Sequence, residues 1–133
     1  MRRCLLLLCS ILLLFLACQS SEENRIYRTL SQREEALRAK DFSLYLSCIS
    51  KAYQDKNEDM GRLQNRIGGY FDNFDQIKYT NWDRSIQIEG DKATVIQQFY
   101  LEVEQGGKKH QFSGKEAFFL KREKRDWKIV AGL

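Results

Sequence analysis

Apolar side chains recur at spacings of three and four between Ile26 and Phe71, a pattern typical of amphipathic helices. A first helix is predicted over residues 26–39, where good helix formers such as Glu34 and Ala36 surround the apolar positions. A second helical segment is predicted after Asp41, because aspartate is a favoured N-cap. Its apolar stripe consists of Phe42, Tyr45, Leu46, Ile49 and Tyr53.

A third helix is predicted to begin at Asn57, which is a good N-cap residue. Glu58 and Asp59 would then lie in the first turn, where the helix dipole favours negative charge. The apolar stripe of this helix consists of Met60, Leu63, Ile67 and Phe71. The pair Gly68-Gly69 weakens helical propensity, so it is predicted to mark the exit from the helix.

After Phe74 the apolar positions alternate with polar ones, which is typical of half-buried strands. Five strands are predicted, over residues 77–79, 86–88, 93–103, 110–120 and 127–131. Gly90-Asp91 and Gly106-Gly107 supply turns between strands. Helices followed by a run of antiparallel strands predict an α+β domain, with the helices on one face of the sheet. The core is expected to contain Phe99, Phe118, Trp127 and Ile129.

The N-terminal segment has the pattern of an export signal. Arg2 and Arg3 precede an apolar run over residues 5–16, which is followed by the small residue Ala17. The stretch from Cys4 to Cys18 is shorter than the roughly 17–25 residues of an ordinary spanning helix. Because Cys18 directly follows Ala17, the segment resembles a bacterial lipoprotein signal, although Phe15 stands where that pattern usually has leucine. The alternative is an ordinary secretory signal.

The lipoprotein resemblance implies three parts of the chain. Residues 1–17 would be the signal peptide, residues 18–25 a lipidated polar tether, and residues 26–133 the folded domain. Acylated Cys18 would hold the protein in a lipid bilayer of the bacterial cell envelope, on the periplasmic side. Gln19 follows the cysteine where an aspartate commonly signals inner-membrane retention, so the outer membrane is favoured.

Charge and cysteine content narrow the classes of partner and cofactor. The sequence carries a formal charge of +4, of which two charges lie in residues 1–17, and this near balance argues against nucleic acid as a partner. The nearest basic cluster, residues 121–125, is interrupted by Glu123 and is interpreted as a solvated loop. Cys48 is the one cysteine in the expected domain, so no internal disulfide and no zinc site of the His/Cys type is expected. No cofactor and no metal are predicted.

Three stretches of the domain resemble the nuclear transport factor 2-like superfamily. They are ALRAKDFSLYLSCISKAYQ in the helices, IQIEGDKATVIQQFYLEV in a hairpin and FFLKREKRDWKIVAGL at the end of the chain. The resemblance implies a curved sheet wrapped over helices in a cone-shaped roll with an apolar interior. It implies little about activity, because this superfamily includes isomerases, cyclases, dehydratases and non-catalytic binding domains.

One carboxylate is predicted on the apolar face of the fourth strand. Counting by two places Glu116 between Gly114 and Phe118, where burial would favour the neutral acid. A neutral acid beside a tyrosine is how a ketosteroid-isomerase site stabilises an enolate, so Glu116 is a weak catalytic candidate. A bulge at Gly114 would instead turn Glu116 to solvent, and an inward Glu116 could also be purely structural. The candidate ligand-binding residues are Tyr45, Gln97, Phe99, Glu116 and Phe118.

Two functions remain open at this point. The favoured one is a non-catalytic lipoprotein domain that binds a small apolar ligand or a protein partner, with the open sheet face as a candidate homodimer surface. The alternative is a small cofactor-free enzyme of the isomerase or cyclase kind, with an acid pair in the cone. Two titratable side chains converging in the pocket would favour the enzyme. Cys48 and His110 are not expected to be catalytic, and His110 is expected near an exposed hairpin tip.

Overall fold

The computed structural model describes residues 2–133, with side chains described from Ser21 onward. Helix α1 (Arg2–Ala39) is longer than the predicted 26–39, because the polar residues 18–25, predicted as a tether, are also helical. Glu22 in this segment contacts the domain through the Trp127 indole. In the part of the chain whose side chains are described, no helix is both long and apolar enough to cross a membrane.

Helix α2 (Phe42–Ser47) begins where the sequence predicts, since the side chain of Asp41 accepts a hydrogen bond from Leu44 N. It ends earlier than its apolar stripe suggests. Ile49 forms a parallel bridge with Ile129 of the last strand, so the stripe residue Ile49 is buried in extended structure instead of in a helix.

The third helix also begins and ends differently from the prediction. The N-cap of α3 (Met60–Asn73) is Asp59 and not Asn57, because residues 54–59 form a small hairpin of β1 (Gln54–Asp55) and β2 (Glu58–Asp59). Gly68-Gly69 does not end the helix, which continues for a further turn to Asn73. Burial of Phe71 in the core stabilises that last turn despite the two glycines.

The main sheet has four antiparallel strands in chain order: β3 (Gln76–Glu89), β4 (Lys92–Gln105), β5 (Lys108–Glu123) and β6 (Asp126–Ala131). The two short strands predicted over 77–79 and 86–88 form a single strand, β3, with an irregularity between Trp82 and Ser85. The extra residue there reverses the alternation, so that odd-numbered Ile77 and even-numbered Ile86 both lie toward the helices.

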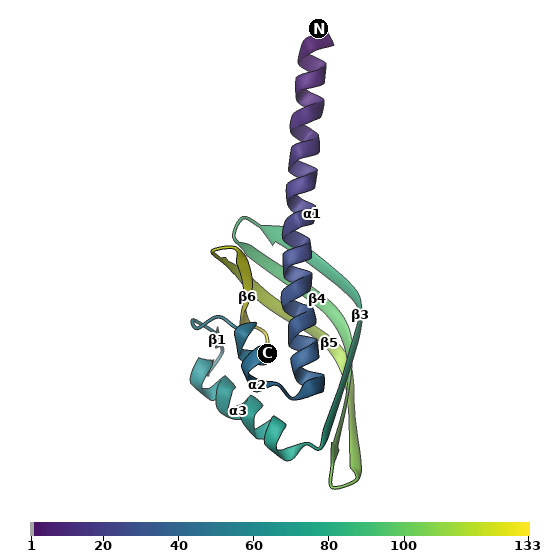
Figure 1. The fold of residues 1–133 in the computed structure, drawn as a ribbon, viewed down its shortest axis with the longest axis vertical. Coiled ribbons are helices and arrows are strands. Elements are labelled where there is room, and N and C mark those ends of the chain that lie inside the picture. The colour runs from purple at the N-terminus through teal and green to yellow at the C-terminus, as the bar shows by residue number, and fades with distance from the viewer. Residues whose placement is uncertain (1) are drawn as a thin grey trace.

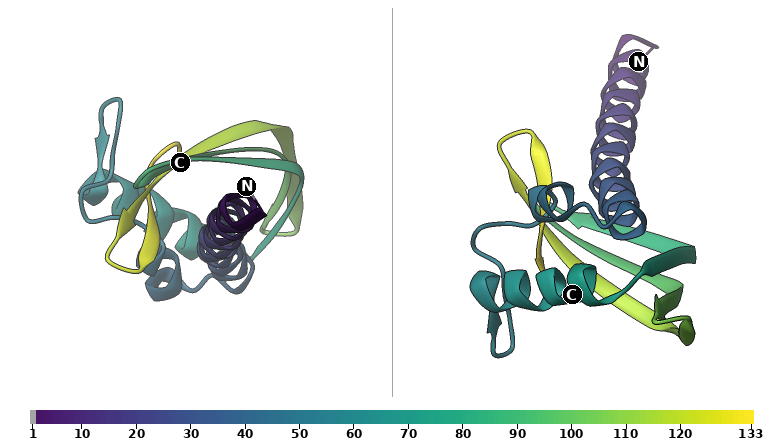
Figure 2. Two further views of the ribbon diagram at one scale, coloured as in Figure 1. Left: turned by 90° about the horizontal axis from the view of Figure 1, so that it is seen from above. Right: turned by 60° about the horizontal axis from the view of Figure 1, so that its bottom comes forward.

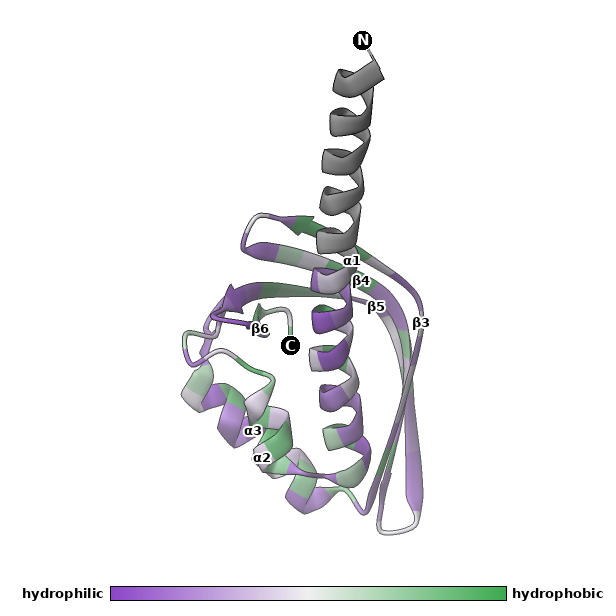
Figure 3. Ribbon diagram, turned by 45° about the horizontal axis from the view of Figure 1, so that its top comes forward, coloured by the Kyte–Doolittle hydropathy of each residue, from purple (hydrophilic) through white to green (hydrophobic). Residues whose placement is uncertain are grey.

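The sheet curves around the helices, as the α+β prediction expects (Figure 1). Viewed from above, α1 lies inside the curve, while α2 and α3 lie beside it near β6 (Figure 2). Apolar and polar residues alternate along the strands that wrap this interior (Figure 3). The predicted core is confirmed, since Phe118, Trp127 and Ile129 are each 0% exposed. Phe99 packs against this core but is only partly buried.

Candidate functional site

Glu116 lies on the concave face of the sheet. It pairs with Gln97 across β4 and β5, and the register is regular through Gly114, so the bulge that would have turned Glu116 outward is absent between these two strands. The Tyr79 hydroxyl donates to Glu116 Oε1, and Gln97 Nε2 donates to the same oxygen at 2.8 Å. Of the alternatives that the sequence left open for Glu116, the structure has the inward one.

A buried cation that the sequence did not predict lies in the same interior. Arg33 of α1 is only 7% exposed, and its Nε has no hydrogen-bond partner among the described residues. Its guanidinium carbon lies 4.7 Å from the ring centroid of Phe118, 5.2 Å from that of Tyr79 and 5.9 Å from that of Tyr45. Arg33 lies on the same face of α1 as the buried Leu30 and Leu37. This position in the apolar stripe was the sequence feature that could have indicated its burial.

The surroundings of Arg33 keep it charged. Burial works against its charge, but Tyr45, Tyr79 and Glu116 outweigh this effect and raise the pKa of Arg33 above its ordinary value. Burial, opposed by Arg33 and reinforced by Glu116, raises the pKa of Tyr79 well above that of a free tyrosine. At neutral pH the Tyr79 hydroxyl is therefore a donor that keeps its proton.

A second arginine extends the network to the edge of the cone. Arg84 Nε donates to Gln97 Oε1 at 2.6 Å, and Arg84 Nη2 donates to Asn81 Oδ1 at 2.9 Å and to the carboxylate of Glu34. Gln97 is 1% exposed, so its amide requires these partners. These contacts join α1, β3, β4 and β5. We call this network of Glu34, Tyr79, Arg84, Gln97 and Glu116 the brace, because it links the helix to the sheet.

Glu116→Gln is expected to destabilise the fold by about 1.5–3 kcal/mol, the order of a hydrogen bond to a charged group. From the sequence alone, this substitution is expected to leave the stability of the fold unchanged or slightly higher near pH 7. Arg33 reverses this expectation, because the glutamine amide carries no negative charge to offset the buried guanidinium. Urea unfolding at pH 7 measures the change. Glu35→Gln on the exposed face of α1 is the control and should shift stability by less than about 0.5 kcal/mol. Equal stability of both variants would show that Arg33 does not depend on Glu116.

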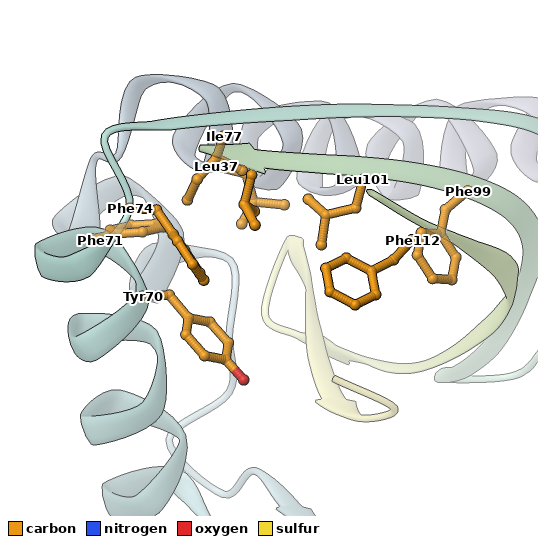
Figure 4. Close-up of a pocket in the computed structure, with 9 residues that line it drawn as sticks. Leu37, Tyr70, Phe71, Phe74, Ile77, Phe99, Leu101 and Phe112 are labelled. Carbon is orange, nitrogen blue, oxygen red and sulfur yellow. The ribbon is translucent and has the colours of Figure 1, made fainter. Parts of the chain in front are cut away.

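An apolar pocket of about 380 Å³ lies beside the brace, between α3 and the sheet. Figure 4 shows side chains entering it from α3 on one side and from the strands on the other. All the lining residues are apolar or aromatic, and the Tyr70 hydroxyl is their single polar side-chain group. They are Leu37, Tyr70, Phe71, Phe74, Ile77, Phe99, Leu101, Val103 and Phe112.

The predicted ligand-binding residues divide between the pocket and the core. Phe99 lines the pocket and stacks on Tyr79 with ring centroids 6.4 Å apart. Tyr45 and Phe118 are buried around Arg33, and Gln97 and Glu116 belong to the brace. The contribution of α3 to the pocket was not predicted, because its apolar stripe indicates only a helix face packed on the core.

The remaining candidates lie apart from the pocket. Cys48 is buried, and burial raises the pKa of its thiol, which disfavours the reactive thiolate. His110 is exposed near the turn between β4 and β5, as expected. Cys18 lies outside the residues whose side chains are described. Among the described residues no group of three His, Cys, Asp or Glu side chains is placed to hold a metal ion.

Comparison with known proteins agrees with this architecture. A family model described as a SnoaL-like domain matches residues 24–132, almost the whole of the folded part. The chain belongs to the SnoaL-like family. No curated protein is similar enough in sequence to match it.

Solved structures share the SnoaL-like chain's fold at low identity. A variant of a protein of unknown function from Mycobacterium tuberculosis has a TM-score of 0.75 and 14% identity, covering 88% of this chain and 72% of that one. A protein from Streptomyces avermitilis, provisionally named a dehydratase of the nuclear transport factor 2-like family, has a TM-score of 0.73 and 13% identity, with 85% and 94% covered. A provisional scytalone dehydratase from Novosphingobium aromaticivorans has a TM-score of 0.74 and 12% identity, with 84% and 80% covered.

At these identities the likeness shows the fold and not the activity. It confirms the nuclear transport factor 2-like architecture that the three sequence stretches indicated.

Proposed function

We propose that this SnoaL-like chain is a lipid-anchored envelope protein whose domain binds a small, uncharged, apolar molecule without transforming it. The observation that supports binding is the composition of the pocket. Its volume lies within the usual range for small-molecule sites, and aromatic and aliphatic side chains form nearly all of its wall.

The position of the polar groups favours binding over catalysis. An enzyme of the isomerase or cyclase kind needs at least two titratable groups beside the reacting atoms. Tyr79 and Glu116 do converge, but neither is among the residues that line the pocket. Glu116 Oε1 already accepts hydrogen bonds from the Tyr79 hydroxyl and from Gln97 Nε2. The pair therefore supports a role in holding the cone together.

A charge in the exposed part of the pocket wall should weaken binding of an apolar probe. Phe112 lines the pocket but is 54% exposed, so Phe112→Lys should fold normally while placing an ammonium group in the apolar wall. We expect the affinity for a neutral solvatochromic dye, measured by fluorescence titration, to fall at least about tenfold, the equivalent of about 1.4 kcal/mol.

Phe119→Lys is the matched control, because Phe119 is on the same strand, is 47% exposed and lies outside this pocket. It should bind the dye like the unaltered protein. Equal loss in both variants, or no loss in either, would refute the pocket as the binding site.

The anchor has its own test, motivated by the Ala17-Cys18 boundary. Cys18→Ser should prevent acylation and processing, so that the uncut precursor accumulates. Metabolic labelling with an alkyne fatty acid, followed by gel analysis, measures incorporation. Similar labelling of the unaltered and Cys18→Ser proteins would refute lipidation at this residue. Stable anchoring requires more than one acyl chain. The labelled protein should therefore be recovered in the membrane fraction.

A further inference from the structure

Glu22, near the beginning of the part of α1 whose side chains are described, attaches this helix to the last hairpin of the sheet. Trp127 Nε1 donates to Glu22 Oε2 at 2.7 Å, and Arg122 Nη1 lies 3.7 Å from Glu22 Oε1. One turn further along, Arg25 Nη1 donates to the carbonyl of Arg125 at 3.4 Å. The chain is therefore attached to the domain at Glu22, earlier than residue 26, where the sequence placed the end of the tether.

Only a short stretch separates Cys18 from this attachment. Four residues span about 6 Å if they are helical and at most about 14 Å if they are fully extended. Whatever its conformation, the stretch keeps Cys18 close to the end of the domain where Glu22 meets Trp127.

Two turns of the sheet lie at that same end. Arg122 N donates to the carbonyl of Asp91 at 2.8 Å, so the β5–β6 turn and the β3–β4 turn are neighbours. Figure 1 shows both turns beside α1, at the end of the sheet from which the N-terminal half of α1 projects. We call residues 121–126 the anchor-side turn, and four of its six residues are basic. The carboxylate of Glu123 accepts from the buried Ser50 hydroxyl.

We propose that the anchor-side turn lies against the phosphate-bearing headgroups of the membrane that holds acylated Cys18. The proposal rests on the lipid anchor of the proposed function. Its two supports are the short link from Cys18 to Glu22 and the exposed positive charges of Lys121, Lys124 and Arg125, which complement lipid phosphate.

This orientation places the pocket at the far end of the domain. Val103 lines the pocket, and it lies 11 residues along β4 from Lys92 at the β3–β4 turn. That separation is about 36 Å along a regular strand, and less across a curved sheet. The pocket would take its ligand from the aqueous side of the envelope and not directly from the bilayer that anchors it.

The test compares two labels at opposite ends of the full chain. Lys124→Cys in the anchor-side turn and Lys108→Cys at the β4–β5 turn both replace exposed lysines. Each variant is made in a Cys48→Ala background, purified from bacterial membranes and reconstituted in vesicles of phosphatidylethanolamine and phosphatidylglycerol. A fluorophore on the new cysteine is then quenched by lipids that carry a headgroup acceptor. Circular dichroism confirms that each variant is folded.

We expect energy transfer to be at least threefold more efficient from position 124 than from position 108. Equal transfer from both positions, or stronger transfer from 108, would overturn the proposed orientation. Fatty-acid labelling of the same preparation separates the two proposals. Acylated protein with equal transfer refutes the orientation alone, whereas absence of acylation refutes the anchor and the orientation with it.

Discussion

Trp127→Ala is expected to destabilise the domain by about 3–5 kcal/mol, the usual cost of truncating a large aromatic residue in a core. Trp127 is 0% exposed, its indole donates to Glu22, and its carbonyl accepts from Thr29 at 2.8 Å. A domain of this size has about 5–15 kcal/mol of stability in total, so this loss is a large fraction of it. Urea unfolding followed by circular dichroism measures the loss without depending on tryptophan fluorescence.

Trp82→Ala is the matched control for that experiment. Trp82 is the other tryptophan of the sequence and is 47% exposed on β3. Its loss should change the free energy of unfolding by less than about 1 kcal/mol, since surface substitutions are usually small. A similar cost for both tryptophans would mean that Trp127 does not carry the packing assigned to it here.

Gly132→Ala is expected to cost roughly 2–5 kcal/mol, which combines left-handed backbone strain with overpacking. Gly132 has φ of 99°, and a Cβ added there would lie 2.0 Å from the carbonyl oxygen of Ala117. That oxygen belongs to the backbone of β5, so it cannot move aside as a flexible side chain would. The main expected effect is detachment of the C-terminal end of the chain from β5, with a lower melting temperature.

Gly107→Ala distinguishes the cost of backbone strain from the cost of overpacking. Gly107 also has a positive φ, of 78°, but nothing lies within 4 Å of its Cβ position. It should lose only the strain, about 1–2 kcal/mol. If Gly132→Ala cost no more than Gly107→Ala, the close approach to Ala117 would be refuted as a stabilising feature of the fold.

The period-2 pattern was sufficient to predict the faces of β4, β5 and β6. In these strands one face meets the helices, so a register error would have exposed residues as apolar as Val95, Phe118 and Ile129. The same alternation made an inward Glu116 one of two possibilities, and only the regular register of β4 and β5 through Gly114 decides between them. The cap at Asp41 was predictable because capping depends on a single local hydrogen bond.

Other features depend on contacts that a local pattern does not contain. The irregularity near Asp83, whose φ is 53°, is a tertiary adjustment that joins two apparent strands into one. The helix passes through Gly68-Gly69 because Phe71 is buried beyond them. Arg33 was missed since arginine is rarely buried, and only the three aromatic rings and Glu116 around it explain its place.

The contact between α1 and β6 determines when this chain can fold. Thr29 bonds Trp127 and Glu22 bonds the Trp127 indole, across sequence separations of 98 and 105 residues. Ile129 N also bonds the carbonyl of Cys48, so β6 closes the middle of the chain as well. Closing such long loops slows folding, although the main sheet itself pairs only strands that are neighbours along the chain. The contacts of Thr29 and Cys48 with β6 form only after the last strand has been synthesised, so the native interior is expected to be completed only after translation of nearly the whole chain.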